Sequence, residues 1–224
     1  MSCAVNSLTG NSRVVFSCKH CGACCRDIEE KIMLEPYDAY RLGRWLRDQK
    51  RIESIEEVYT KFAHAIMLSD AFPIYVLNSC GEDQHCIFLQ ESKCSIYDAR
   101  LKVCRLYPFT VDFGQRGKRF FYYQRLDQHA DRHFRDGSIR INDWMYQNFS
   151  KVERDVLDLE KTVLPKLGKL MRQLGPDGQK ANLFLTLYYR YYNYNLDQPF
   201  MEQFRCNQQT LLNELEQKLS KEKR

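Results

Sequence analysis

The chain lacks any long apolar run. Nowhere in its 224 residues do hydrophobic side chains extend over the ~20 positions that a helix needs to cross a bilayer. The first residues, Met1–Phe16, contain neither the basic leader nor the apolar segment of a secretory signal. We therefore expect a cytoplasmic protein with no membrane partner. Its ten cysteines are then expected to be reduced thiols, and disulfides are the competing interpretation.

Other familiar signals are also missing. No glycine-rich loop follows a predicted strand, which argues against a Rossmann-type nucleotide site. The excess of five positive charges is too small to indicate a nucleic-acid partner, because faces that bind nucleic acids are more strongly basic. With 44% hydrophobic and 28% charged residues, the composition is that of a globular chain long enough to bury a core.

Cysteine is what the chain has in excess. Four cysteines lie within the eight residues Cys18–Cys25, in a C-x-x-C-x-x-C-C run. Four more follow, at Cys80, Cys86, Cys94 and Cys104. Thiolates bind zinc and iron–sulfur centres, and a two-residue spacer lets two sulfurs face the same ion. Eight clustered cysteines exceed the needs of one four-ligand site and could supply two. Cys3 and Cys206 lie outside the cluster and are expected to be free or buried thiols.

The spacing of the run does not settle which metal binds. The C-x-x-C-x-x-C pattern resembles the start of a bacterial ferredoxin run without its C-x-x-x-C-P end, whereas zinc sites usually show two separated C-x-x-C pairs. We favour an iron–sulfur cluster slightly, because three thiolates two residues apart can cup one face of a cubane, and zinc is the alternative. Adjacent side chains usually diverge, so the sequence leaves open which of Cys24 and Cys25 is a ligand.

Hydrophobic periodicity predicts helices and short strands around the cysteines. A first helix is expected to begin at Pro36 and to end before Gln49. A second helix is predicted from the spacing of Ile55, Val58, Phe62 and Ile66. Short strands are expected at residues 28–34 and 74–77, and a β-hairpin at residues 108–125.

The later part of the chain is predicted to be helical. A long helix is expected from an N-cap at Asn142 to Leu174, with an interruption or kink at Pro165. A turn at 175–178 precedes a tyrosine-rich helix over 183–196 and a last helix over 199–221. We predict a helix-rich α+β fold. An irregular cysteine-cluster metal-binding domain with one hairpin would span residues 1–140, and a helical C-terminal region packed on it would span 141–224.

Four motifs occur in a fixed order: Phe16-Ser-Cys-x-x-Cys-Gly-x-Cys-Cys, Cys86-Ile-Phe-Leu, Cys94-Ser-Ile-Tyr-x-x-Arg and Cys104-Arg-Leu-Tyr-Pro-Phe109. Together they resemble the YkgJ-like cysteine-cluster (CxxCxxCC) family, described as a zinc- or iron-chelating domain. This family is related to the N-terminal part of flagellin lysine N-methylases. The resemblance covers roughly residues 16–140. It implies metal ligands at Cys18, Cys21, Cys24, Cys25, Cys86, Cys94 and Cys104.

The chain departs from the family pattern at two places. Arg100-Leu101 stands where the family usually has Arg-Pro, and the segment after the hairpin lacks the further cysteine that many members carry. The missing ligand is expected to be His129, to be replaced by Cys80, or to be absent. His129 and His133 stand four apart, so on a helix they would share one face.

Three functions follow from these observations. The first is a metal-binding protein whose iron–sulfur or zinc centre has a structural or redox role. The second, suggested by the resemblance, is an S-adenosylmethionine-dependent protein-lysine (flagellin-type) N-methyltransferase with a protein substrate. The third is a metal-handling or interaction module that recruits a protein partner through tyrosines 188–194, although such a stripe more often packs in a core. The sequence assigns no catalytic residue and leaves open whether the chain is an enzyme.

Overall fold

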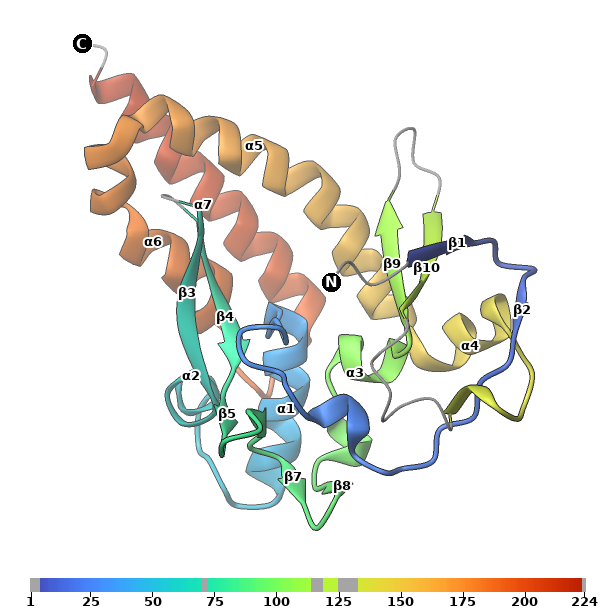
Figure 1. The fold of residues 1–224 in the computed structure, drawn as a ribbon. Coiled ribbons are helices and arrows are strands. Elements are labelled where there is room, and N and C mark those ends of the chain that lie inside the picture. The colour runs from blue at the N-terminus through green and yellow to red at the C-terminus, as the bar shows by residue number, and fades with distance from the viewer. Residues whose placement is uncertain (1–4, 70–71, 114–118, 125–132, 223–224) are drawn as a thin grey trace. The chain divides into compact units, whose positions relative to one another are not determined.

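The computed structural model describes residues 5–69, 72–113, 119–124 and 133–222 (Figure 1). The chain forms two compact units, and each is built from two separate segments. Unit 1 comprises Met1–Glu29 and Ser79–Ser150, and unit 2 comprises Glu30–Asn78 and Lys151–Arg224. The eight clustered cysteines all lie in unit 1. Helices and short antiparallel strand pairs make up both units, which confirms the predicted helix-rich α+β class.

Unit 1 contains one small sheet and several two-residue strand pairs. Strands β1 (Val5–Leu8), β10 (Arg119–Gln124) and β9 (Phe109–Phe113) form an antiparallel three-stranded sheet in that order. The predicted hairpin is therefore confirmed, and its turn lies outside the described residues. A second pair joins β2 (Arg13–Val14) to β11 (Ile139–Arg140). Two tight hairpins carry cysteines: β5 (Ser79–Cys80) pairs with β6 (His85–Cys86), and β7 (Leu89–Gln90) pairs with β8 (Lys93–Cys94). The α-helices in the described part of this unit are α3 (Lys102–Leu106) and α4 (Ile141–Asn148).

Aromatic packing around Phe16 forms the core of unit 1. The Phe16 side chain is 2% exposed, and its ring lies 5.3 Å from that of Trp144 and 6.1 Å from that of His133, centroid to centroid. Trp144 also donates its indole N–H to the carbonyl oxygen of Leu106, at 3.2 Å. The aromatic residue that precedes the cysteine run thus fixes the run to the body of the unit.

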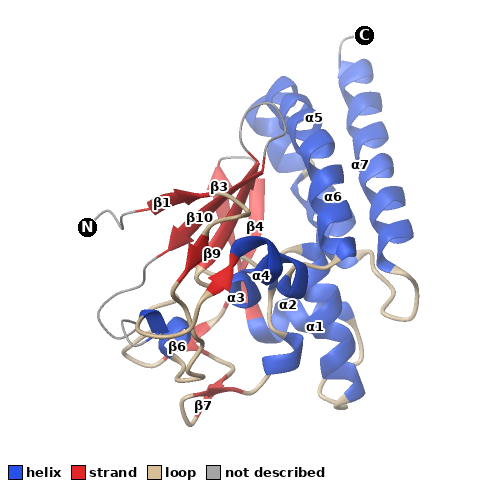
Figure 2. Cartoon of the chain, turned by 90° about the vertical axis from the view of Figure 1, so that its right-hand side faces the viewer, coloured by secondary structure: helices blue, strands red, loops and turns tan. Residues whose placement is uncertain are grey.

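Unit 2 consists of helices around a two-stranded sheet. The helices are α1 (Pro36–Asp48), α2 (Ile55–Phe62), α5 (Lys151–Ala181), α6 (Leu183–Leu187) and α7 (Phe200–Glu222), and a π-helical turn spans Tyr188–Tyr192. The strands are β3 (Ala63–Ser69) and β4 (Phe72–Leu77). Helices α5 and α7 lie side by side in both views (Figure 2), and buried Leu167 and Met171 pack with Leu211 and Leu215 between them. No described helix is both long enough and apolar enough to cross a membrane.

The predictions near the first helices are partly confirmed. Helix α1 begins at Pro36 and ends before Gln49 as expected, and β4 covers the predicted strand at 74–77. The second predicted helix is too long. Helix α2 ends at Phe62, and Ile66 instead pairs with Ile74 in the β3–β4 sheet. Isoleucine suits both helix and strand, and backbone pairing with β4 decides in favour of the strand. In the predicted strand at 28–34, only Met33 forms a bridge.

The long C-terminal helix breaks after Leu174 as predicted, but its other interruption lies between Asn148 and Lys151 rather than at Pro165. Helix α4 has its N-cap at Arg140 rather than Asn142, and it ends at Asn148 before α5 begins at Lys151. Pro165 lies inside α5 without interrupting it, whereas Gly175 adopts φ 66° and ψ 178° and breaks the helix. A glycine tolerates positive φ, and Pro176 is suited to the first turn of the helical segment that follows. The tyrosine-rich helix is shorter than predicted and continues as the π-helical turn.

Candidate metal centre

Short elements of unit 1 carry the eight clustered cysteines. Cys18 and Cys21 lie in the loop after Phe16, and Cys24 and Cys25 lie in the 3₁₀ turn η1 (Ala23–Cys25). The later cysteines follow on paired strands and a helix: Cys80 in β5 (Ser79–Cys80), Cys86 in β6 (His85–Cys86), Cys94 in β8 (Lys93–Cys94) and Cys104 in α3. In the part of the chain that the structure describes, nine cysteines are free thiols, including Cys206 of unit 2.

Gly22 lets the cysteine run approach the β7–β8 hairpin, in which β7 is Leu89–Gln90. Its φ of +71° places it in the left-handed region, where residues with a side chain are strained. A Cβ at this position would lie 2.7 Å from Cδ1 of Leu89 and 2.9 Å from the carbonyl oxygen of Ser92. The glycine therefore allows η1 to pack directly against the hairpin that carries Cys94.

The side chains of Cys24 and Cys25 lie within hydrogen-bonding reach of each other. A hydrogen bond from the Cys25 thiol lowers the pKa of Cys24 to about 7, although burial opposes this change. The same hydrogen bond raises the pKa of Cys25 well above its ordinary value, and burial and the neighbouring thiols of Cys104 and Cys86 raise it further. The expectation that adjacent cysteine side chains diverge does not hold in this tight turn.

The remaining thiols of the cluster also influence one another. Burial raises the pKa of Cys86 to about 11, with further contributions from Cys94, Cys80 and Cys24. Burial likewise raises the pKa of Cys94, and Cys24 adds to that effect. Coulomb interactions fall off with distance, so thiols that shift each other's pKa are close neighbours. The five of these cysteines that are buried or half-buried form a set, which we call the thiol group: Cys24, Cys25, Cys86, Cys94 and Cys104.

Arg100 is the cation that faces the thiol group. Its positive charge lowers the pKa of both Cys24 and Cys94, in opposition to burial. The guanidinium carbon lies 3.7 Å from the centre of the Tyr97 ring, which holds the side chain in place. In the sequence, Arg100 ends the motif Cys94-Ser-Ile-Tyr-x-x-Arg and begins the Arg100-Leu101 departure, but neither pattern predicted that it would face the thiols.

Cys21 contacts a buried histidine outside the thiol group. Sγ of Cys21 lies 3.0 Å from Nε2 of His133, whose side chain is 2% exposed. The backbone places this histidine, because the N–H of Ser17 donates to the carbonyl oxygen of His133 at 2.8 Å. His129, the histidine proposed as a ligand from the sequence, lies outside the described residues. Of the two histidines spaced four apart, the structure therefore places His133 against the cysteine run.

Cys80 belongs to a second pair of thiol and imidazole. On the β5–β6 hairpin its Sγ lies 3.2 Å from Nε2 of His85, and Nδ1 of His85 lies 2.6 Å from Oδ1 of Asp83. Asp83 also forms an ion pair with Arg26, and the contacts with His85 and Arg26 hold the pKa of its carboxyl group below the usual range. Cys80 is exposed and lies at the edge of the thiol group rather than within it.

Comparison with known families agrees with this arrangement. The sequence model of the family CxxCxxCC, described as "Putative zinc- or iron-chelating domain", matches residues 17–132. The chain belongs to the CxxCxxCC family. No curated protein and no solved structure matches the chain. The matched segment contains all eight clustered cysteines and ends one residue before His133, so that histidine lies just outside the family pattern.

The donor set suits the metals named for the CxxCxxCC family. Thiolate sulfur and imidazole nitrogen are ligands for zinc and for iron–sulfur clusters, and both kinds of donor are present here. Among the residues that the structure describes, no three side chains of Cys, His, Asp or Glu converge closely enough to hold a single metal ion. The thiols therefore lie in one region, but they do not converge on a single metal position.

Proposed function

We propose that unit 1 holds an iron–sulfur cluster, with ligands drawn from the thiol group. The observation that carries this proposal is that five thiols from η1, β6, β8 and α3 interact electrostatically within one partly buried region. Iron–sulfur clusters are held by cysteine thiolates, usually four of them. Zinc binding by the same thiols is the alternative, and membership of the CxxCxxCC family is compatible with either metal.

The spacing of the thiols supports a cluster over a single ion. A tetrahedral zinc ion draws four sulfur atoms to one centre at bond length, whereas a cubane of irons and sulfides is a larger body whose ligating thiolates stand farther apart. The described side chains are close enough to shift each other's pKa but do not converge on one point. Neighbouring thiols that do not converge are compatible with a larger centre.

Cys18, Cys21 and His133 complete the candidate ligand set. His133 supplies a nitrogen donor next to Cys21, in a chain that lacks the further cysteine implied by the family resemblance. Cys18 and Cys94 both help to raise the pKa of the Tyr97 phenol, so both cysteines lie near this side chain. We propose that Cys18, Cys21 and His133 lie on the same side of the centre, either as alternative ligands or as ligands of a second metal.

The protein's own residues prepare this region for a negatively charged centre. Arg100 offsets the charge of the thiolates, and the burial of Cys86, which is 8% exposed, limits access of water. A cluster bound there would supply a rigid cross-link between the cysteine run and the later hairpins, and would be able to accept and donate single electrons. The proposed role is therefore structural or electron-transferring.

Anaerobic purification of the full chain tests the proposal. We expect a brown protein with absorbance at about 400 nm and stoichiometric iron and sulfide. Cys104→Ser should lower the iron content and the absorbance together, because Cys104 is within the thiol group. Cys206→Ser is the matched control, since Cys206 lies in unit 2 and away from the cluster. A colourless protein with bound zinc would replace the iron–sulfur assignment by a zinc centre.

A further inference from the structure

Unit 2 contains a pocket that has no part in the metal centre. Its volume is about 590 Å³, within the range of small-molecule sites. The walls come from α2, the π-helical turn, the loop that follows it, and α7. The residues relevant here are two tyrosines and two glutamates: Tyr188, Tyr192, Glu56 and Glu202.

The walls of the pocket carry negative charge and aromatic rings. Glu56 and Glu202 are exposed, and neither forms an ion pair with any residue that the structure describes. No lysine or arginine is present among the residues that line the pocket. Tyr188 is 39% exposed, and tyrosine rings attract cations through their faces. Carboxylates and aromatic faces without a cation of their own favour a positively charged ligand.

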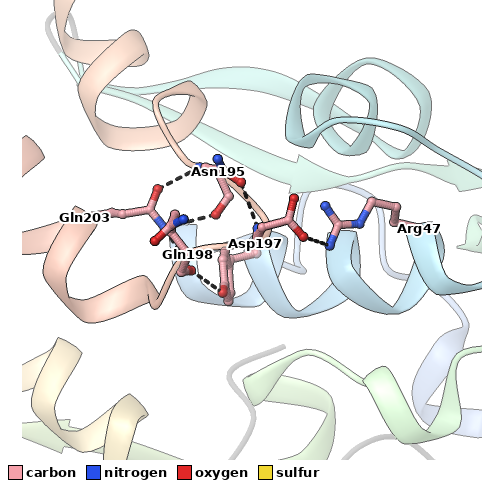
Figure 3. A network of polar contacts seen from close by, with 6 residues as sticks. Arg47, Asn195, Asp197, Gln198 and Gln203 are labelled. Atoms are coloured by element: carbon pink, nitrogen blue, oxygen red, sulfur yellow. Dashed lines mark hydrogen bonds and ion pairs between the residues drawn. The ribbon is translucent and has the colours of Figure 1, made fainter.

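Hydrogen bonds hold the walls in place without a ligand. The Asn193 amide donates to Oδ1 of Asn207 at 2.7 Å, and the Asn207 amide donates to the carbonyl oxygen of Asn193 at 2.6 Å. Figure 3 shows a second set, in which the Asn195 N–H donates to Oε1 of Gln203 at 2.7 Å and the Gln203 amide donates back to the Asn195 carbonyl at 3.0 Å. A preformed wall reduces the entropy that a ligand must lose on binding.

The π-helical turn at this position is a second indication of a site. π-Helical turns are rare and occur frequently at functional sites. Here the turn is followed by the backbone hydrogen bond from Asn193 N–H to the Tyr188 carbonyl at 2.9 Å, and both residues line the pocket. The tyrosines of the turn lie in two different places. Tyr191 is buried in the core, at 2% exposure, whereas Tyr188 and Tyr192 line the pocket.

A buried phenol also belongs to the pocket. Tyr194 is 6% exposed and lines the cavity. Burial raises the pKa of this phenol, and the amides of Asn207 and Gln208 lie near enough to offset part of that rise. Even so, the hydroxyl forms no hydrogen bond of ordinary geometry with a described residue. The hydroxyl oxygen is itself buried, so Tyr194 contributes other atoms of its residue to the pocket wall.

We propose that this pocket binds an organic cation, an ammonium or guanidinium group on a short flexible chain. The carboxylates of Glu56 and Glu202 balance its charge, and the rings of Tyr188 and Tyr192 contact its alkyl or planar part. Such a group comes either from a free polyamine or from a basic side chain of another protein.

Calorimetric titration of the full chain distinguishes these sources. The probes are spermidine, Nα-acetyl-lysine amide and Nα-acetyl-arginine amide, and the control ligand is the lysine derivative acetylated at Nε, which is uncharged. We expect binding of at least one charged probe and none of the uncharged control. Binding of spermidine alone assigns a free polyamine, whereas binding of the amino-acid derivatives assigns a basic side chain of a protein.

Single substitutions test the assignment of the pocket. Glu202→Gln and Tyr188→Ala should each weaken binding about two- to fivefold, as expected for one exposed ion pair or one cation–π contact. Glu53→Gln is the matched control, because Glu53 is an exposed glutamate outside the pocket, and it should bind like the parent. Absence of binding by all charged probes, equal binding of the uncharged control, or indifference to Glu202→Gln would overturn the proposal.

Discussion

At the scale of single residues, His133 is the side chain whose position adds most to the metal centre. It is buried, and its Nε2 lies 3.0 Å from Sγ of Cys21. The imidazole contributes a nitrogen donor, which the thiol group lacks. Two variants test whether it binds the metal directly: one removes the nitrogen donor, and the other replaces it with a sulfur donor.

We predict that His133→Ala weakens metal binding at least about tenfold, the smallest loss usually seen when a group that binds or orients a metal ligand is removed. His133→Cys should retain most of the metal, because a thiolate can replace an imidazole as ligand. Competition with a chelator, followed by metal analysis, measures both affinities. His64→Ala, at an exposed histidine of unit 2, serves as the control. Equal metal retention in His133→Ala and His64→Ala would exclude His133 as a ligand.

Gly22 gives a prediction about stability at the same scale. Gly22→Ala should lower the free energy of unfolding by at least about 1 kcal/mol, because the left-handed backbone and the approach of Leu89 and Ser92 both exclude a side chain. Urea denaturation measures the change. Gly168→Ala is the control: Gly168 lies in α5 with only ordinary contacts around an added Cβ, so alanine there should be neutral or stabilising by up to about 1 kcal/mol. Unchanged stability in Gly22→Ala would contradict this account.

Residue chemistry explains which parts of the site could be predicted from the sequence. Cysteine has few common roles, so a dense cluster of cysteines predicts a metal centre without knowledge of the fold. Arg100 and the pairing of Cys80 with His85 could not be predicted in this way. Arginine is usually exposed, and the contact between Cys80 and His85 depends on the register of a two-residue hairpin. These positions are set by tertiary structure rather than by local pattern.

At the scale of secondary-structure elements, prediction succeeded where periodicity was strong. Helix α1 and the β9–β10 strands have clear three-to-four-residue or two-residue repeats, and both were located well. The boundary between α2 and β3 was missed because apolar residues on either side fit both patterns. The break at Gly175 agrees with the turn predicted at 175–178, whereas the interruption predicted at Pro165 is absent, because α5 accommodates that proline.

The elements of unit 2 are joined by a buried ion pair. Nη2 of Arg190, in the π-helical turn, lies 3.1 Å from Oε1 of Glu160 in α5, with side-chain exposures of 5% and 13%. Arg190 Nη1 also donates to Oε1 of Gln208 in α7, at 3.3 Å. Burial alone would lower the pKa of Arg190, but the charge of Glu160 outweighs this effect and keeps the guanidinium ionised.

We predict that Arg190→Ala destabilises the protein by about 3–5 kcal/mol, because it leaves the Glu160 carboxylate buried without its cation. Chemical denaturation monitored by helical circular dichroism measures the loss. Lys169→Ala, at an exposed position of α5, should change stability by less than about 0.5 kcal/mol. A loss below about 1 kcal/mol in Arg190→Ala would show that the pair is solvated or replaceable.

At the scale of the whole molecule, the two units differ in what holds them together. Unit 2 has an extended apolar core between α5 and α7, whereas unit 1 has short elements around Phe16 and the cysteines. A small domain with short elements depends more on cross-links for its stability than one with long packed helices.

We therefore predict that removal of the metal unfolds unit 1 before unit 2. Binding energy at a structural metal site contributes directly to folding, so the cysteine segments 16–29 and 79–110 should lose protection when the metal is chelated. Hydrogen exchange with mass spectrometry, before and after chelation, follows each segment separately. Helices α5 and α7 should keep their protection. Loss of protection throughout the chain, or in neither unit, would contradict a structural role confined to unit 1.

Unit 1 is built from two segments that are far apart in the sequence, so a metal that joins them would close a long loop of chain. A metal bound to both Cys25 and Cys104 would close a loop of about 80 residues, most of which belong to unit 2. The entropy of closing a loop rises only slowly with length, by about 0.6 kcal/mol for each doubling. The ends are also held together in unit 1, since the N–H groups of Asp27 and Ile28 donate to the carbonyls of Asp83 and Gln84. The length of the loop therefore adds little to the entropy that a metal must overcome to join the two segments.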